Sequence, residues 1–280
     1  FFQAEDGIRD TSVTGVQTCA LPILLAVAEY IWRKYCVKRG YDVRGMLASM
    51  GVALGQGLFR PLTGMVVLAI MTFVHGFAPV KFPVNSALTW LSGFFALEFV
   101  YYWFHRASHR VRWMWATHSV HHSAREMILP AAIRLGWTEL FSGGWLFFSA
   151  LALIGFPPLV VAVLLAANLL YQYPLHTEAI GRLGPLEWIF NTPSHHRAHH
   201  SRDQEWLDCN FGGTLIIFDR MFGSFRPEPT DRSLNYGLAH RPPTHNPFRI
   251  AFGEWIALAR DLCYSRSWKE RFAIALRPPG

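Results

Sequence analysis

Histidines in this chain gather in three short groups whose spacing indicates a metal centre. The groups occupy residues 105–109, 118–122 and 195–200. Histidines three or four positions apart lie on one face of an α-helix, so each group directs two or three imidazole rings to the same side. Imidazole suits Zn, Cu, Fe and Ni, and eight such rings exceed the three or four that one zinc ion takes. Two metal ions are the simplest interpretation.

The alternative for any single histidine is a surface or core residue without a ligand, and the density of these groups argues against it. A zinc finger of the Cys2His2 type is excluded because the chain has no Cys-x2–4-Cys pair. The four cysteines are isolated from one another, so no disulfide framework is indicated. By the same reasoning, His75, His240 and His245 stand alone and are expected to be structural.

The first 23 residues resemble the translation of a sequencing-library adapter, with two constant parts around a short index. We therefore expect residues 1–23 to be an artefact rather than a signal peptide or a domain. The natural chain would then begin near Leu24, already within an apolar run, with its own N-terminus missing. Residues 24–280 are expected to form a single membrane-embedded domain, with the core motifs in residues 90–227.

The composition favours a membrane protein over a nucleic-acid-binding one. The chain carries a formal net charge of +7, but 51% of its residues are hydrophobic and 15% are aromatic. Such a composition suits a bilayer better than a nucleic acid, and no nucleic-acid partner is expected. The expected partner is a membrane lipid that serves as the substrate.

Several apolar stretches are long enough to cross or enter a bilayer. Residues 62–80 and 86–104 each approach the 20 residues that a hydrocarbon core of roughly 30 Å requires. Residues 140–156 and 159–173 are shorter and joined at Pro157-Pro158, which predicts a helical hairpin that need not span completely; a soluble core hairpin is the alternative. Residues 45–59 fit an interfacial or tilted helix. The expected fold is an all-α polytopic membrane bundle of about four spanning or hairpin helices with a histidine-rich helical cap.

Basic residues predict the orientation of this bundle. Arginines flank all three histidine groups, whereas the loops at 75–87 and 155–158 offer only Lys81. By the positive-inside rule, every histidine group then faces the cytoplasm. We expect an integral membrane protein of a bacterial inner membrane with the metal site on the cytoplasmic side.

Four further side chains are candidates to support the metal ligands. Glu98 precedes His105 by seven residues, two helical turns along one face, and is expected to hold the second nitrogen of that ring. Asp219 and Glu178 could act likewise, although Asp219 could instead pair with Arg220 or another arginine. His195 points about 100° away from its neighbour His196 on a helix, so a supporting role is favoured over ligation.

The order of these motifs resembles the fatty acid hydroxylase/sterol desaturase superfamily of integral membrane di-iron enzymes. The resemblance covers about half the chain, from Trp90 to Pro227, and includes the segment Phe218-Asp-Arg-Met-Phe-Gly-Ser-Phe225 after the last histidine group. Within it, Leu175-His-Thr-Glu178, Asn191-Thr-Pro-Ser-His-His196 and Leu215-Ile-Ile-Phe-Asp219 are most similar to the alkylglycerol monooxygenase branch.

The resemblance implies a set of ligands that includes one histidine outside the three groups, His176. Relatives with a His-x3-His pair at that point would place the first histidine at Gln172, so this chain departs from that variant. The implied metal ligands and catalytic residues are His105, His109, His118, His121, His122, His176, His196, His199 and His200.

The resemblance also implies the reaction. Two iron ions would use O2 to hydroxylate or desaturate a lipid such as an alkylglycerol, a fatty acyl chain or a sterol. Zinc could replace iron in purified samples, because nitrogen donors bind Zn2+ more tightly than Fe2+. Electrons must come from outside, since the chain has neither a dinucleotide fingerprint after a strand nor a Cys-x-x-Cys-His motif. The alkylglycerol branch implies tetrahydrobiopterin, and other branches imply a redox protein.

Two other classes of protein use membrane histidines. A metal transporter would hold its ligands near the middle of the bilayer, whereas these histidines lie at the ends of the expected spans and in the cap. A metal-binding protein without oxygenase activity is the other form of this alternative. A di-haem cytochrome would pair axial histidines across helices, and the His-x2-His-His groups are too dense for that arrangement.

Overall fold

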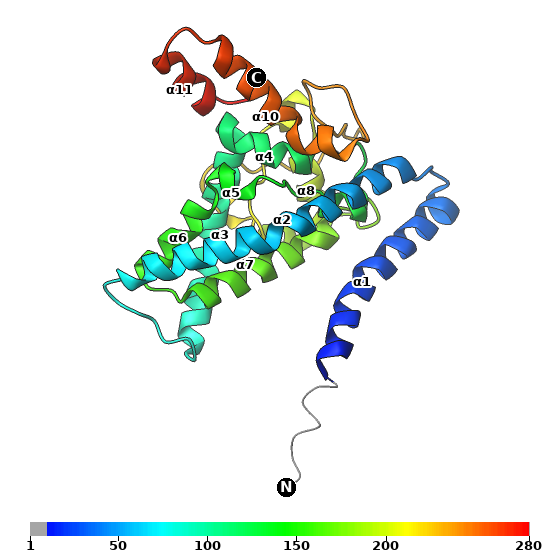
Figure 1. Ribbon diagram of the computed structural model, residues 1–280. Coiled ribbons are helices and arrows are strands. Elements are labelled where there is room, and N and C mark those ends of the chain that lie inside the picture. Colours follow the sequence, from blue (N-terminus) through cyan, green and yellow to red (C-terminus); the bar gives the residue numbers. More distant parts are fainter. Residues whose placement is uncertain (1–9, 280) are drawn as a thin grey trace.

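The computed structural model describes residues 10–279, with side chains from Leu21 onwards. Within that range the chain forms helices and loops, and its only β pairings are two isolated bridges. The all-α expectation is therefore confirmed (Figure 1). The α-helices are α1 (Asp10–Trp32), α2 (Val43–Gly76), α3 (Ala87–Arg110), α4 (Arg112–His122), α5 (Glu139–Ser142), α6 (Trp145–Ile154), α7 (Pro158–Gln172), α8 (Pro193–His199), α9 (Ile217–Met221), α10 (Pro247–Tyr264) and α11 (Trp268–Leu276).

Four of these helices pack around one apolar core. Met71 of α2, Leu97 of α3, Leu151 of α6 and Val161 of α7 are all buried in the same hydrophobic cluster. In Figure 1, α2, α6 and α7 run along one another below α10 and α11. Between helices of membrane type, such packing stabilises the bundle mainly through van der Waals contacts.

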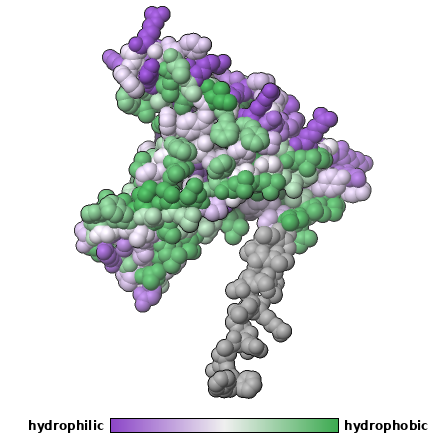
Figure 2. All heavy atoms as spheres, in the orientation of Figure 1, coloured by the Kyte–Doolittle hydropathy of each residue, from purple (hydrophilic) through white to green (hydrophobic). Residues whose placement is uncertain are grey.

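Two helices in the described part of the chain are long and apolar enough to cross a membrane. They are α2 and the segment Pro158–Leu175, which is α7 extended by a short 3-10 turn. Large apolar side chains on α2 point outward, and Leu58 is 80% exposed. Hydrophobic residues cover the region of α2 and its neighbours in Figure 2. Such a continuous apolar surface is typical of helices that contact lipid.

The boundaries of the apolar segments differ from those expected. The interfacial helix at 45–59 and the span at 62–80 are one continuous helix that runs through Pro61. A proline removes one backbone hydrogen bond, but α2 is packed on both sides of it, at Val52 and at Met71. The hairpin at Pro157-Pro158 is present, and its first helix, α6, has only ten residues. The expected span at 86–104 lies in α3, which is not one of the two candidate spans.

The cap is formed by short helices at one end of the bundle. α3 continues directly into α4 through Val111, whose extended backbone breaks the helix. α4 in turn packs against α10 and α11, and α10 also contacts α2. Hydrophilic residues gather over this part of the molecule in Figure 2.

The segment after residue 24 is tied to the cap by polar contacts. The Glu29 carboxylate accepts hydrogen bonds from the backbone N–H of Leu129 at 2.8 Å and from the hydroxyl of Thr177. Arg33 forms ion pairs with Glu126 and Glu178. The expected artefact covers residues 1–23, of which the first nine lie outside the described residues, and its assignment stays a prediction.

Candidate metal centre

The nine histidines of the expected ligand set come together in two adjacent clusters. In each cluster one ring nitrogen of every histidine lies within 4.8 Å of the others. The clusters touch, since the rings of His122 and His200 stack with centroids 4.3 Å apart. The first histidine cluster consists of His105, His109, His118, His122 and His199, and the second of His121, His176, His196 and His200.

Histidines of one helix are divided between the clusters, although the sequence suggested that each group acts as a unit. On α4, His118 and His122 are four residues apart and belong to the first cluster, while His121 belongs to the second. On α8, His199 belongs to the first cluster, and the pair four residues apart, His196 and His200, to the second. Both divisions follow the helical rule that positions i and i+4 share a face. α4 and α8 therefore each contribute to both centres.

One loop orients three rings of the first cluster. The carbonyl oxygen of Phe211 accepts the Nδ1–H of His105 at 2.8 Å, and that of Cys209 accepts the Nδ1–H of His199 at 2.7 Å. The carboxylate of Asp208 lies 3.5 Å from Nδ1 of His109. A carbonyl can only accept, so the first two contacts fix the tautomer and leave Nε2 as a lone pair facing the cluster.

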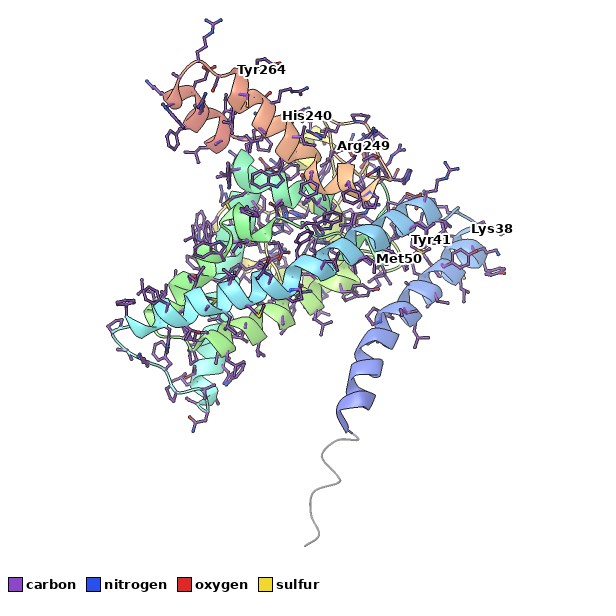
Figure 3. All side chains as sticks on the ribbon, in the orientation of Figure 1. Lys38, Tyr41, Met50, His240, Arg249 and Tyr264 are labelled. Carbon is purple, nitrogen blue, oxygen red and sulfur yellow. The ribbon has the colours of Figure 1, made fainter. Side chains whose placement is uncertain are left out.

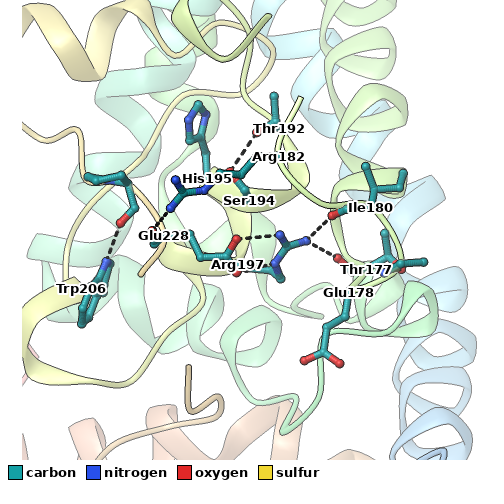
Figure 4. Close-up of polar contacts among 12 residues, drawn as sticks. Thr177, Glu178, Ile180, Arg182, Thr192, Ser194, His195, Arg197, Trp206 and Glu228 are labelled. Carbon is teal, nitrogen blue, oxygen red and sulfur yellow. Dashed lines mark hydrogen bonds and ion pairs between the residues drawn. The ribbon is translucent and has the colours of Figure 1, made fainter. Parts of the chain in front are cut away.

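The second cluster is oriented by different segments. His176 donates Nδ1–H to the carbonyl of Gln172 at 2.9 Å, and Nδ1 of His121 lies 3.3 Å from the carbonyl of Arg134. Arg197 joins α8 to the chain that follows His176. Its guanidinium donates to the carbonyls of Thr177 at 2.8 Å and Ile180 at 2.7 Å, and it pairs with the Glu228 carboxylate (Figure 4). This bridge sets the distance between His176 and the histidines of α8.

The Nε2 atoms converge so closely that a cation between them would relieve the repulsion of their lone pairs. Nε2 of His176 lies 3.1 Å from Nε2 of His121 and 2.9 Å from that of His196. Because Nδ1 of His176 and of His121 already donates to a carbonyl, both Nε2 atoms carry lone pairs in the neutral rings, and two lone pairs at that distance repel. In the first cluster, the buried Nε2 atoms of His109, His122 and His199 have no hydrogen-bond partner among the described residues.

Burial disfavours a proton as that cation. Desolvation, followed by repulsion from neighbouring rings, holds the pKa values of His118, His122 and His196 well below the ordinary value. Desolvation lowers the pKa of His176 to about 4. The rings are therefore neutral near pH 7 and present lone pairs, which is the form that binds a metal. The donor sets fit two metal ions.

The two expected carboxylates, Glu98 and Asp219, hold the orienting loop. Asp219 accepts the backbone N–H groups of Phe211 and Gly212, each at 2.7 Å. Glu98 accepts those of Thr214 at 2.8 Å and Leu215 at 2.9 Å. The expected contact between Glu98 and His105 is wrong, because that ring bonds to Phe211 instead. The expected ion-pair alternative for Asp219 is also wrong, since backbone amides satisfy this buried carboxylate.

Glu98 also reaches the second cluster through two amide side chains. Its other oxygen accepts the Asn168 side-chain amide at 2.6 Å, and the Asn168 oxygen accepts the Gln172 amide at 2.6 Å. The backbone carbonyl of Gln172 is the acceptor for His176. One buried carboxylate therefore supports elements that orient both clusters. The Gln172 side chain itself lies outside the second cluster.

The two remaining expected supports lie away from the ring nitrogens. Glu178 pairs with Arg33 at 3.2 Å and with Arg39 at 3.6 Å, so its expected contact with a ligand is wrong. The Glu178 carboxylate is partly exposed, and the two arginines that pair with it come from the segment that follows α1. His195 belongs to neither cluster, and its Nε2 lies 3.8 Å from a carboxylate oxygen of Glu187, so its expected role in supporting a ligand stays a prediction.

Sequence reasoning missed Asp208, Asn168 and Gln172 as supports. Asp208 has a left-handed backbone, with φ of 59°, which aims its carboxylate at His109. No spacing rule links residues almost a hundred positions apart. The polar residues Asn168 and Gln172, four apart on the apolar helix α7, were a usable signal, because a buried amide in such a helix needs a partner.

The fold and the site define a class of protein: a helical protein with membrane-type helices and two clusters of buried histidines. A family model described as fatty acid hydroxylase matches residues 90–224, which include all nine clustered histidines. The chain belongs to the fatty acid hydroxylase family.

Three curated proteins that are 35–47% identical to this chain are alkylglycerol monooxygenases. The chain is 35% identical to that of Xenopus tropicalis over 258 residues, which cover 92% of this chain and 56% of the relative. It is 42% identical to that of Homo sapiens over 198 residues, or 71% and 44% of the two chains. It is 47% identical to that of Danio rerio over 211 residues, or 75% and 46%. The chain thus spans about half the length of these relatives. No solved structure matches it.

Proposed function

We propose that this chain carries the catalytic domain of a di-iron, O2-dependent lipid monooxygenase that acts on an alkylglycerol or a related ether lipid. The observation that carries the proposal is the convergence of Nε2 lone pairs, with His176 and His121 only 3.1 Å apart. The family and the names of the relatives supply the class of reaction and of substrate.

In this proposal the first cluster holds one iron with up to five imidazoles and the second holds the other with up to four. Iron in a site of this kind supplies O2-dependent oxidation of an unactivated C–H bond. The chain's own contribution is to fix the rings. Carbonyls of residues 209 and 211 hold the first set, while those of Gln172 and Arg134 hold the second.

The apolar core continues to the first cluster, which supports a lipid substrate. Tyr101 belongs to the core of α2, α3, α6 and α7, and its ring lies 5.5 Å from that of His105. An alkyl chain that enters from the bilayer would run along apolar helices, and its polar end would remain at the basic cap. Hydroxylation is favoured over desaturation because the relatives named above are monooxygenases.

The electron donor and the membrane orientation complete the proposal. We assign an external reductant, tetrahydrobiopterin or a redox protein, and a cytoplasmic cap, because arginines surround the histidine groups. The relatives named above are vertebrate proteins, so the expected bacterial inner membrane has no support from them. We therefore place the protein in a cellular membrane, with the cap on the cytoplasmic side, and do not assign the membrane to a bacterium.

A metal transporter is the rival function. Transport sites are formed near the middle of membrane spans, whereas both clusters lie at helix ends, on α4, on α8 and at the end of α3. This placement favours an enzyme over a transporter.

The test is an assay of iron-loaded protein in detergent or nanodiscs with tetrahydrobiopterin, an alkylglycerol and isotopically labelled O2. We expect one labelled oxygen atom in the lipid product by mass spectrometry. A fatty acyl lipid and a sterol serve as alternative substrates. Metal uptake into vesicles without any oxygenated product would contradict the proposal.

A further inference from the structure

A hollow lies beside α4, along the face that carries Arg112, Trp115 and Ser119. It is partly open to solvent, has a volume of about 890 Å3 and is lined by residues of α4, α10, the end of α11 and the loop at 236–244. Cavities that bind small molecules are typically about 300–1,000 Å3. In Figure 3, His240 of this loop and Arg249 of α10 lie at the same end of the molecule.

Seven arginines and two acids line the hollow, so its charge is strongly positive. Both acids are already engaged, since Asp261 pairs with Arg112 and Glu254 with Arg241. The other five arginines have no acidic partner and no side-chain hydrogen bond within the described range. They are Arg125, Arg202, Arg249, Arg260 and Arg277.

These five arginines come from four separate segments of the chain. Arg249 and Arg260 are eleven residues apart on α10, close to three full turns, so both lie on the same face. Arg125 follows α4, Arg202 follows α8, and Arg277 ends α11. The backbone N–H of Arg112, at the start of α4, donates to the carbonyl of Arg277 at 3.0 Å and anchors that end of the hollow.

These five arginines are exposed, so solvent screens their mutual repulsion, but together they give the hollow a positive potential that attracts anions. One nitrogen of Arg112 is buried without an acceptor in the part of the chain that the structure describes, although another nitrogen of the same guanidinium pairs with Asp261. The planar guanidinium binds two oxygens of a phosphate at once, and a phosphate group has enough oxygens and negative charge to join arginines from separate segments. We propose that this hollow, the arginine cavity, binds a small molecule through one or more phosphate groups.

Trp115 connects the arginine cavity with the first histidine cluster. Trp115 lines the cavity, and its ring lies 5.3 Å from that of His109 and 5.5 Å from that of His122. A molecule bound in the cavity would therefore lie close to this indole. The binding proposal itself rests on the arginines and is independent of the metal chemistry.

The experiment is calorimetric titration of the full chain, in nanodiscs of zwitterionic lipid, with inorganic pyrophosphate. We expect saturable binding that weakens at least ten-fold in the double variant Arg249→Gln, Arg260→Gln. The same double change to lysine keeps the charge and should retain part of the affinity, which excludes misfolding as the cause of the loss. No saturable binding to the unaltered chain would overturn the proposal.

The matched control is Arg266→Gln, an exposed arginine after α10 that does not line the cavity. It removes one charge and should leave pyrophosphate affinity within two-fold. The single variant Arg249→Gln, which also removes one charge, is compared with this control and should weaken pyrophosphate binding by at least three-fold. Equal losses in the two single variants would show general attraction to a basic surface and would refute a defined site.

The source of the phosphate is tested in the same nanodiscs. Phosphatidic acid is added to the bilayer before the titration. Competition with pyrophosphate would assign the cavity to a lipid headgroup, and unchanged affinity would assign it to a soluble molecule. Both results support a phosphate site, provided that the arginine variants weaken binding.

Discussion

Asp219 and His105 are linked through one residue, Phe211. The Asp219 carboxylate accepts the backbone N–H of Phe211 at 2.7 Å, and the carbonyl oxygen of Phe211 accepts the Nδ1–H of His105 at 2.8 Å. Asp219 also accepts the hydroxyl hydrogen of Ser224 at 2.7 Å. A buried acid thereby sets the position of a loop whose carbonyls orient imidazoles, without touching a ring itself.

Asp219→Asn should loosen this loop. An amide oxygen can replace one carboxylate oxygen, but the amide nitrogen then faces a backbone N–H, and two donors repel. We expect metal affinity of the first cluster to fall about 10–100-fold, with the second cluster less affected. Metal content per chain, measured at a series of free metal concentrations, checks this. Asp231→Asn, at an exposed position, is the control, and equal metal loss in both variants would contradict the positioning role.

Glu98→Gln should affect both clusters. One oxygen of Glu98 holds the amides of Thr214 and Leu215, and the other holds Asn168, which leads to the backbone that orients His176. A loss of about 10–100-fold in affinity or activity is expected for such supporting contacts. The measurement is metal stoichiometry together with product formation. Retention of both ions with full activity would show that Glu98 serves only the fold.

His121→Ala should remove a ligand from the second cluster and abolish product formation. Its Nε2 atom lies among those of His176, His196 and His200, so its loss leaves three rings in place of four. We expect one ion less per chain and no detectable turnover. His75→Ala is the matched control, because His75 lies outside both clusters and its Nε2 lies 3.3 Å from the carbonyl oxygen of Gly155. Full oxygen-dependent turnover by His121→Ala would refute the catalytic proposal.

Removal of metal should destabilise the fold. Without a cation, the converging lone pairs repel, and the folded state loses the free energy of binding, about 2.7 kcal/mol for each ion supplied at 100 times its Kd. We expect a chelator to lower Tm by several degrees. Zinc should restore Tm without restoring turnover, because it has no redox chemistry. An unchanged Tm after complete metal removal would show that the clusters are not metal sites.

Reporter fusions should place the cap on the cytoplasmic side. Arginines flank the histidine groups, and the loop between α2 and α3 offers only Lys81. Fusions after Arg125 and at the C-terminus should both report cytoplasm, and a fusion near Val84 should report the opposite face. A cytoplasmic signal at Val84 would instead indicate that α2 and α3 do not both cross the membrane.

The sequence alone determined the helical class, the histidine groups and the family. Helical periodicity is a local property, so residues such as His118 and His122 must share a face wherever the helix lies. The apolar stretches predicted the membrane character. The expected break between residues 45–59 and 62–80 was wrong, because packing on both sides of Pro61 maintains one continuous helix. The resemblance to the family supplied His176, which no spacing rule identifies.

Only the tertiary structure decided how the histidines divide and which groups hold them. A rotation of 100° per residue separates His121 from His122, but the packing of α4 against α3 and of α8 beside His176 determines which centre each ring reaches. Likewise, a buried carboxylate bonds to whichever donors the fold brings to it. Glu98 was seven residues from His105 along one helix, yet the backbone amides of Thr214 and Leu215, far along the chain, lie closer to its oxygens.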